Sequence, residues 1–248
     1  MGVADEQSSG PMIRDTRSGT FPPALPTSLS DRRSIRENDW AAFRTVPQMI
    51  DHWGRRDWPA DHETYFWYLT FHDPELVELV RRCNDKLNLD GIDFVPLDGL
   101  HVTMLRIGDL DEIKDEDIQA LTDEAKSKLD EVKPFKLEVG PLAGSRGAIR
   151  FTVSPWTELF HLHRAIRKST RQVLPSIPLA STENFRPHLG IGYSNQRQDA
   201  EPIIKQISTI RDLNTVTVQV DSIKIVKLRR ESQAYRWNDV ATLELGAN

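Results

Sequence analysis

The sequence predicts an α+β fold built from two similar lobes. The order strand, helix, strand, helix occurs twice between residues 65 and 210, and strand-rich sequence then ends the chain. In each copy the second strand carries a histidine near its start, His101 in the first copy and His188 in the second. Helices set against strands in this order indicate an α+β arrangement rather than one doubly wound parallel sheet.

Composition sets the limits of what the chain can be. With 248 residues, 38% of them hydrophobic, it is long enough for one substantial domain or for two small lobes that share a core. The 32 basic and 37 acidic residues give a net charge of -5, which argues against a broad surface for long nucleic acid and leaves a small nucleotide or an RNA end as partner.

Cellular location and oligomeric state are expected from absences in the sequence. No apolar run has the length of a membrane span, and the first residues lack the apolar region of a secretory signal. The single cysteine, Cys83, falls on the apolar face of an expected helix, which favours a buried structural thiol in a reducing compartment. We therefore expect a cytoplasmic protein, and a monomer.

The first 45 residues are expected to form a disordered or weakly ordered tail. Residues 1–30 contain four prolines, three glycines and eight Ser or Thr, with too few large apolar side chains to offset the entropy of ordering. From Ser34 onward the chain gains Trp40, Phe43 and Met49, which suit a short helical or irregular lead-in. The bilobed domain is expected at 46–248.

The first copy of the repeat begins with the apolar stretch 65–71, which reads as a buried strand. Asp73 and Pro74 then suit the start of a helix that runs to about residue 87, since Asp is a good N-cap and Pro a good first helical residue. A strand is expected at 100–107, and apolar positions at helical spacing predict a helix at 115–132.

The second copy repeats this order. A strand at 148–153 is followed by Ser154 and Pro155 and a helix to about residue 174, then by a strand at 187–194 and a helix at 201–210. Tyr65 precedes His101 by 36 residues and Ala148 precedes His188 by 40, so the two copies agree within the variation of a loop. Further strands are expected at 216–220, 222–228 and 235–245.

Alternation along each strand predicts which side chains accompany the histidines. His101, Thr103 and Leu105 are expected on one face of the first strand, with Val102 and Met104 on the other. On the second strand, one face is expected to carry His188, Gly190, Gly192 and Ser194, and the other Leu189, Ile191 and Tyr193.

A histidine followed two places later by Ser or Thr is by itself weak evidence for a site. His62 and Thr64 show the same spacing in a polar stretch that has no equivalent in the second copy. The matched positions of His101 and His188 in the repeat are the stronger signal. Two imidazoles suit acid-base work near neutral pH, because histidine can accept or donate a proton there.

Two segments resemble the two-histidine (2H) phosphoesterases, also called the 2'-5' RNA ligase-like superfamily. They are LHVTMLRIG at 100–108 and FRPHLGIGYSN at 185–195, and the likeness covers about residues 48–248. The resemblance implies two pseudo-symmetric lobes of antiparallel sheet with helices on the outer faces and a central cleft. It also implies metal-independent opening of 2',3'-cyclic phosphates, cleavage of related phosphodiesters and reversible 2'-5' joining of RNA ends, with no cofactor.

The resemblance assigns roles residue by residue. His101 and His188 match the two catalytic histidines, and Thr103 matches the hydroxyl that binds phosphate. Gly190 stands where the family usually has Ser or Thr, which leaves its backbone N–H, a water or Ser194 to replace that hydroxyl. Among the arginines, Arg186 is the candidate for phosphate because it precedes His188 by two residues.

Two other functions are compatible with the sequence. Gly190 favours a module that binds an RNA end or a nucleotide without turnover, and the same fold can serve an enzyme with a nonnucleotide substrate. His161 and His163 are not expected to hold a metal, because positions i and i+2 of a helix do not face each other. No glycine-rich phosphate loop and no Ser-His-Asp arrangement stands out, which disfavours kinases, nucleotide triphosphatases and serine hydrolases.

Overall fold

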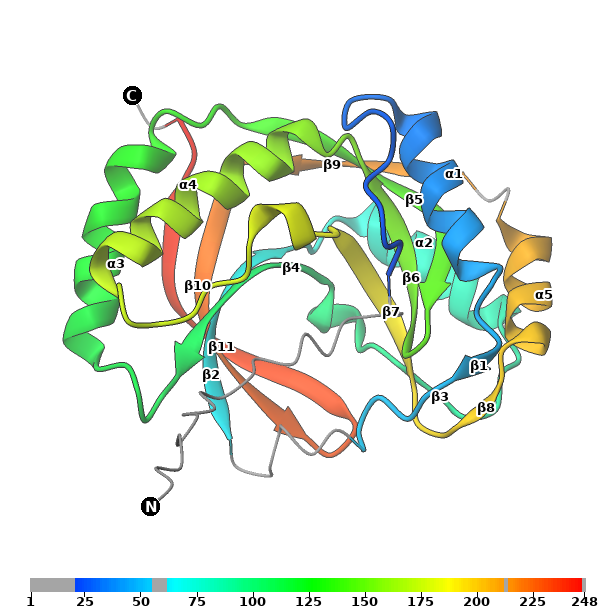
Figure 1. Ribbon diagram of the computed structural model, residues 1–248. Coiled ribbons are helices and arrows are strands. Elements are labelled where there is room, and N and C mark those ends of the chain that lie inside the picture. Colours follow the sequence, from blue (N-terminus) through cyan, green and yellow to red (C-terminus); the bar gives the residue numbers. More distant parts are fainter. Residues whose placement is uncertain (1–20, 55–61, 212–213, 247–248) are drawn as a thin grey trace, which may run out of the picture.

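The computed structural model describes residues 21–54, 62–211 and 214–246. In this part of the chain two antiparallel sheets lie on opposite sides of the molecule's centre, and helices lie around them (Figure 1). The expected α+β class with antiparallel sheets is confirmed. A third, minor sheet pairs β1 (Gln48–Met49) with β8 (Gln198–Asp199).

The first sheet has four strands in the order β11-β10-β2-β4. Its strands are β2 (Glu63–Thr70), β4 (His101–Asp109), β10 (Ser222–Glu231) and β11 (Ala234–Glu244). Strands β2 and β4 run antiparallel, so that Thr70 lies opposite His101 and Tyr68 lies opposite Thr103.

The second sheet has five strands in the order β3-β7-β6-β5-β9. Its strands are β3 (Ile92–Phe94), β5 (Phe135–Ser145), β6 (Ala148–Ser154), β7 (His188–Ser194) and β9 (Val216–Val220). Here Thr152 lies opposite His188 and Arg150 lies opposite Gly190. Each histidine therefore begins its strand opposite a threonine of the preceding strand of its repeat, and the duplication expected from sequence extends to the strand register.

Two of the helices pack on the sheet of the other repeat. The helices are α1 (Arg32–Phe43), α2 (Pro74–Lys86), α3 (Asp115–Leu129), α4 (Thr157–Val173) and α5 (Glu201–Ile210), with short 3-10 turns η1 (Leu97–Gly99) and η2 (Thr182–Asn184). Helix α4 of the second copy packs on α3 and on β4 of the first sheet, whereas α2 of the first copy contacts β9 of the second sheet. This exchange joins the two lobes through one continuous hydrophobic core.

Helix α1 corrects the expectation of a weakly ordered tail through residue 45. Residues 1–20 lie outside the described residues, but α1 is a regular helix whose Asp31 side chain accepts hydrogen bonds from the backbone N–H groups of Arg33 and Ser34. Ile35, Asp39 and Phe43 form its buried face, and the helix packs on β5 and β6. Three positions at helical spacing face the sheet, and their packing against β5 and β6 orders this segment.

Strand β5 was not expected from the sequence, although Phe135, Leu137 and Val139 alternate with polar residues at its start. The other long strands and helices α2 to α5 lie where the sequence places them, within a few residues at their ends. None of the helices in the described residues is long and apolar enough to cross a membrane.

Candidate active site

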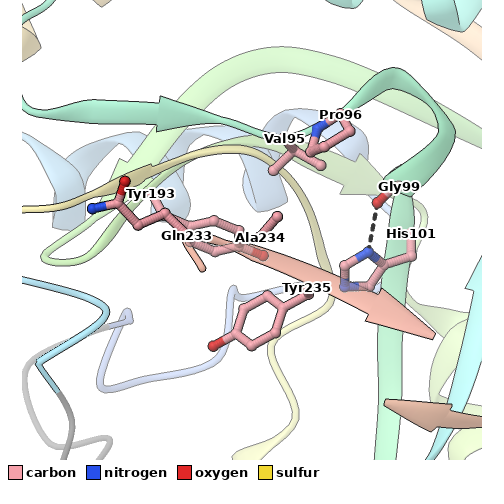
Figure 2. A pocket seen from close by; sticks show the side chains of 8 residues that line it. All are labelled: Val95, Pro96, Gly99, His101, Tyr193, Gln233, Ala234 and Tyr235. Carbon is pink, nitrogen blue, oxygen red and sulfur yellow. Dashed lines mark hydrogen bonds between the residues drawn. The ribbon is translucent and has the colours of Figure 1, made fainter. Parts of the chain in front are cut away.

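His101 is the first residue of β4 and is almost fully buried, at 7% exposure. Its Nδ1 lies 2.8 Å from the carbonyl oxygen of Gly99, which can only accept a hydrogen bond (Figure 2). Nδ1 therefore carries the proton in the neutral ring, and Nε2 is the nitrogen that can exchange a proton with a substrate.

His188 repeats this arrangement in the second sheet. Its Nδ1 donates to the carbonyl oxygen of Arg186 at 2.8 Å, again to the residue two places earlier. The same tautomer follows, with Nε2 as the reactive nitrogen. The two rings are close enough to interact electrostatically, since a charge on His101 lowers the pKa of His188.

Burial sets the acidity of both rings. It lowers the pKa of His101 to about 4, partly opposed by the hydrogen bond to Gly99. It also lowers the pKa of His188 to about 4, with a further lowering by the charge of Arg150, while the hydrogen bond to Arg186 and the carboxylate of Asp39 act in the opposite direction. The unliganded site therefore favours two neutral imidazoles at neutral pH.

Thr103 lies on the same face as His101, as alternation predicts, and directly opposite Tyr68 in the strand register. Leu105 does not share this face. The register shifts between Trp67 and Tyr68, so that Met104 and Leu105 both enter the main core. A β-bulge of this kind adds one residue to a strand and moves every later side chain to the other face.

A second bulge changes the composition of the site around His188. The register of β7 against β6 shifts at Ile191, since Gly190 pairs with Arg150 but Gly192 pairs with Ile149. Tyr193 consequently joins the face of His188 and Gly190, and a Cβ built on Gly190 would lie 3.4 Å from its hydroxyl oxygen. The sequence placed Tyr193 on the opposite face.

The same bulge removes Ser194 from the face on which alternation placed it. Its side chain is fully buried and its hydroxyl donates to the carbonyl oxygen of Gln196 at 2.8 Å. The expectation that Ser194 shares a face with His188 is therefore wrong, and the physical reason is the extra residue at Ile191.

Arg186 also has other partners. Its Nε donates to the carbonyl oxygen of Pro22 at 3.1 Å, and its Nη1 donates to those of Glu183 and Phe185. A further donor, Nη2, reaches the carbonyl oxygen of Pro23 at 3.4 Å. The guanidinium thus holds the segment that precedes α1, and these contacts involve all three of its nitrogens.

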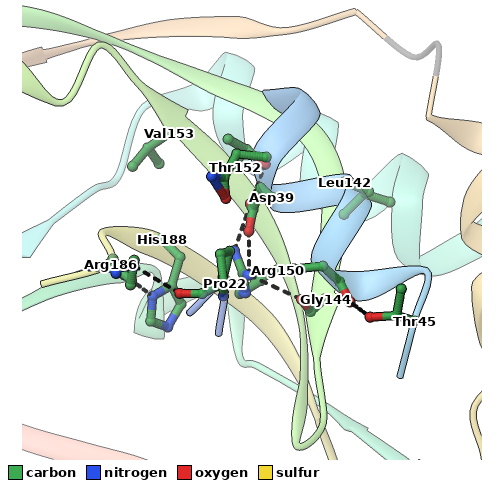
Figure 3. A network of polar contacts seen from close by, with 12 residues as sticks. Pro22, Asp39, Thr45, Leu142, Gly144, Arg150, Thr152, Val153, Arg186 and His188 are labelled. Carbon is green, nitrogen blue, oxygen red and sulfur yellow. Dashed lines mark hydrogen bonds and ion pairs between the residues drawn. The ribbon is translucent and has the colours of Figure 1, made fainter. Parts of the chain in front are cut away.

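Beside His188 lies a buried ion pair that no sequence pattern predicts (Figure 3). Asp39 of α1 accepts two hydrogen bonds from the Arg150 guanidinium, at 2.7 and 2.5 Å, and another from the hydroxyl of Thr152 at 2.5 Å. Arg150 is only 2% exposed and also donates to the carbonyl oxygen of Gly144. The pairing partner is 111 residues away along the chain, so spacing carried no signal.

A cluster of aromatic residues lies beside the cavity at His101. Tyr193 of β7 contacts Tyr235 of β11 edge-on at 5.4 Å between ring centroids, and both contact His52 and Trp53. Tyr193 and Tyr235 line a cavity of about 10 Å³ together with His101, which is room for about one water molecule (Figure 2). The two rings meet because β7 and β11 approach each other in the fold, and the sequence spacing of the two tyrosines does not predict this contact.

A larger polar groove adjoins this cavity. It has a volume of about 370 Å³ and shares Gly99 and Tyr235 with the cavity at His101. Its other lining residues are Thr70, His72, Asp98, Lys224, Arg236, Trp237, Asn238 and Asp239. Trp237, which lines the groove, also contacts the His101 ring at 5.3 Å between centroids, so one side chain separates the groove from the first histidine.

The solved structures that resemble the chain do so at low identity. TT0787 of Thermus thermophilus has a TM-score of 0.57 and 13% identity, and the match covers 74% of this chain and 98% of that one. Escherichia coli LigT, crystallised with 3'-AMP, has a TM-score of 0.53 and 14% identity, with 75% of this chain and 99% of that chain covered. At these identities the likeness shows the fold. A comparison with curated proteins finds no match.

The family comparison is more specific. Residues 73–232, more than half of the chain, match the model of the 2'-5' RNA ligase superfamily. The matched range includes β4 and β7, the two strands that begin with His101 and His188. The resemblance noted in the two short segments is thereby confirmed over most of both lobes, and the chain belongs to the 2'-5' RNA ligase superfamily.

Proposed function

We propose that this chain is a metal-independent phosphodiesterase that opens a 2',3'-cyclic phosphate or a related small nucleotide or RNA-end phosphodiester. The observation that carries the proposal is the matched pair of hydrogen bonds at the histidines. In both lobes Nδ1 donates at 2.8 Å to the carbonyl oxygen of the residue two places earlier. A fixed tautomer with a reactive Nε2 is what proton transfer requires. The buried His163 is also hydrogen-bonded through Nδ1, so the signal is that the same bond recurs at equivalent positions of both lobes.

In this proposal one imidazole takes the proton of the attacking oxygen while the other gives a proton to the leaving ribose oxygen. Each positioned transfer contributes about 100- to 10,000-fold to the rate. The reaction with water yields a phosphate monoester, and the same chemistry with a 5'-hydroxyl joins two RNA ends through a 2'-5' bond.

Thr103 and Gly190 are proposed to hold the phosphate. They occupy equivalent positions, each two residues after its histidine on the same face. The Thr103 hydroxyl and the Gly190 backbone N–H would stabilise the charge that grows on the nonbridging oxygens. The structures of LigT with 3'-AMP and ATP support a small nucleotide as the ligand class.

The test is turnover of a panel of substrates by the purified protein, with and without EDTA. The panel contains 2',3'-cyclic nucleotides, 2'-5'-linked dinucleotides and RNA with cyclic-phosphate ends. We expect EDTA-resistant turnover that falls by a factor of about 100 or more in His101→Ala and in His188→Ala. His161→Ala, an exposed histidine of α4, is the matched control and should retain wild-type activity.

A binding module is the second candidate, because Gly190 lacks the hydroxyl that the family usually provides. It predicts nucleotide binding without turnover, and it predicts that loss of one histidine leaves that binding nearly unchanged. Turnover that survives in either histidine variant would contradict the acid-base assignment.

A further inference from the structure

The segment before α1 lies directly on the second histidine. The Phe21 ring contacts the His188 ring at 4.8 Å between centroids, tilted by 44°. The Arg150 guanidinium lies over the same Phe21 ring, 5.0 Å from its centroid. His188 and Arg150 project from the same face of the second sheet, because Arg150 lies opposite Gly190, which shares a face with His188. Phe21 thus covers the site face of that sheet.

Several hydrogen bonds hold this segment in place. Arg186 donates to the carbonyl oxygens of Pro22 and Pro23. Further along, the carbonyl oxygen of Leu29 accepts from the backbone N–H of Trp156 at 2.7 Å. Pro22 is itself buried. The segment lies outside residues 73–232, the range that matches the superfamily.

The two histidines consequently face different surroundings. On the side of His101, the groove of about 370 Å³ has room for a nucleoside. On the side of His188, the Phe21 ring occupies the space against the imidazole. Phosphoryl transfer places the attacking and leaving oxygens on opposite sides of phosphorus. If the nucleoside lies in the groove, the second reactant must approach on the side that Phe21 covers.

We propose that Phe21 is a specificity-determining residue that limits the second reactant to water, so that the chain hydrolyses cyclic phosphates and does not join them to a 5'-hydroxyl RNA end. The inference rests on the proposed function. In both reactions the bond from phosphorus to one ribose oxygen breaks and a bond to the incoming oxygen forms. One imidazole receives the proton of the incoming oxygen, and the other protonates the ribose oxygen that leaves.

The experiment measures the ratio of joined to hydrolysed product. RNA with a 2',3'-cyclic phosphate end is incubated with a 5'-hydroxyl RNA, using the full chain and its variants. We expect hydrolysis alone from the wild type and a rise of about tenfold or more in the ratio for Phe21→Ala, the size of effect that shape in an apolar pocket supports. Phe21→Leu should give an intermediate ratio.

Two variants serve as controls. Phe21→Tyr keeps the ring and should keep the wild-type ratio. Pro23→Ala changes an exposed side chain of the same segment without removing the carbonyl that Arg186 binds, and it should also keep the wild-type ratio. Efficient joining by the wild type would overturn the inference. An unchanged ratio in Phe21→Ala would also overturn it, as would faster hydrolysis without any joining, which would make Phe21 a general cover.

A binding measurement separates this inference from the proposed function. If the wild type does not hydrolyse cyclic phosphates, the proposed function fails, and adenosine is titrated while the NMR resonances of His188 are followed. Shifts in Phe21→Ala that are absent in the wild type support Phe21 as the barrier. Equal shifts in both proteins, or none in either, overturn it.

Discussion

The imidazole of His101 stacks on the phenol ring of Tyr68, with centroids 4.3 Å apart and planes that differ by 10°. The same tyrosine lies directly opposite Thr103 in the strand register. One side chain of β2 therefore covers a face of the histidine ring and lies beside the threonine two residues further along β4. In the second lobe the position of Tyr68 is taken by Arg150, and the aromatic contact to the histidine comes from Phe21 instead.

The depressed pKa values predict an acidic activity profile. Acid-base catalysis by the pair needs one protonated and one neutral imidazole, and with both pKa values at about 4 this state becomes more populated as the pH falls toward 5. We expect kcat/KM for a 2',3'-cyclic nucleotide to fall by about tenfold for each pH unit above about 5. Initial rates measured from about pH 4.5 to 8 check this, and a maximum at neutral pH would contradict it.

The free energy of unfolding should depend on pH through the buried ring of His101. The pKa of His101 is about 4 in the folded protein and 6.5 in the unfolded chain, so the unfolded chain binds more protons between these values. The contribution of His101 to the free energy of unfolding is fully present above pH 6.5. It is lost as the pH falls toward 4, which lowers the free energy of unfolding by about 3 kcal/mol.

Urea unfolding at several pH values between about 7 and 4.5 measures this dependence. His101→Leu removes the titrating group and should show a shallower loss of unfolding free energy over the same range. His161→Leu, which changes an exposed histidine, should keep the wild-type slope. Equal slopes for wild type and His101→Leu would show that His101 does not titrate differently on unfolding.

Gly190→Ser should improve the enzyme. A Cβ at this position meets the Tyr193 hydroxyl oxygen at 3.4 Å and its ring carbon at 3.7 Å, which are ordinary van der Waals contacts. A serine there adds a hydroxyl on the face of His188, equivalent to Thr103 on the face of His101. We expect kcat/KM to rise by about tenfold, because one well-placed donor is worth about that much or more. Gly190→Ala adds the Cβ without the donor and should give no increase.

Asp39→Ala should destabilise the protein strongly. The substitution leaves the Arg150 guanidinium buried without its carboxylate and removes the acceptor of Thr152. Loss of one partner of a buried pair costs about 3–5 kcal/mol, measurable by urea unfolding near neutral pH.

A double variant distinguishes the pair from general damage to α1. Asp39→Leu combined with Arg150→Met removes both charges and should recover much of the lost unfolding free energy. An Asp39→Ala protein as stable as the wild type would mean that water or another group replaces the carboxylate.

The sequence by itself determined the repeated order of strands and helices and the equivalence of His101 and His188. These follow from local rules, since periodicity reports which face of an element is buried and a proline after a strand marks the start of a helix. It also determined that Thr103 shares a face with His101, because no bulge separates two residues so close in β4.

Only the tertiary structure decided what surrounds the two rings. The bulge at Ile191 placed Tyr193 beside Gly190 and took Ser194 away, and periodicity contains no record of an inserted residue. Asp39 and Phe21 reach the second sheet from a segment that composition marked as a tail. Their partners are more than a hundred residues away in sequence, and contacts at that range depend on how the chain folds back on itself, which local patterns do not encode.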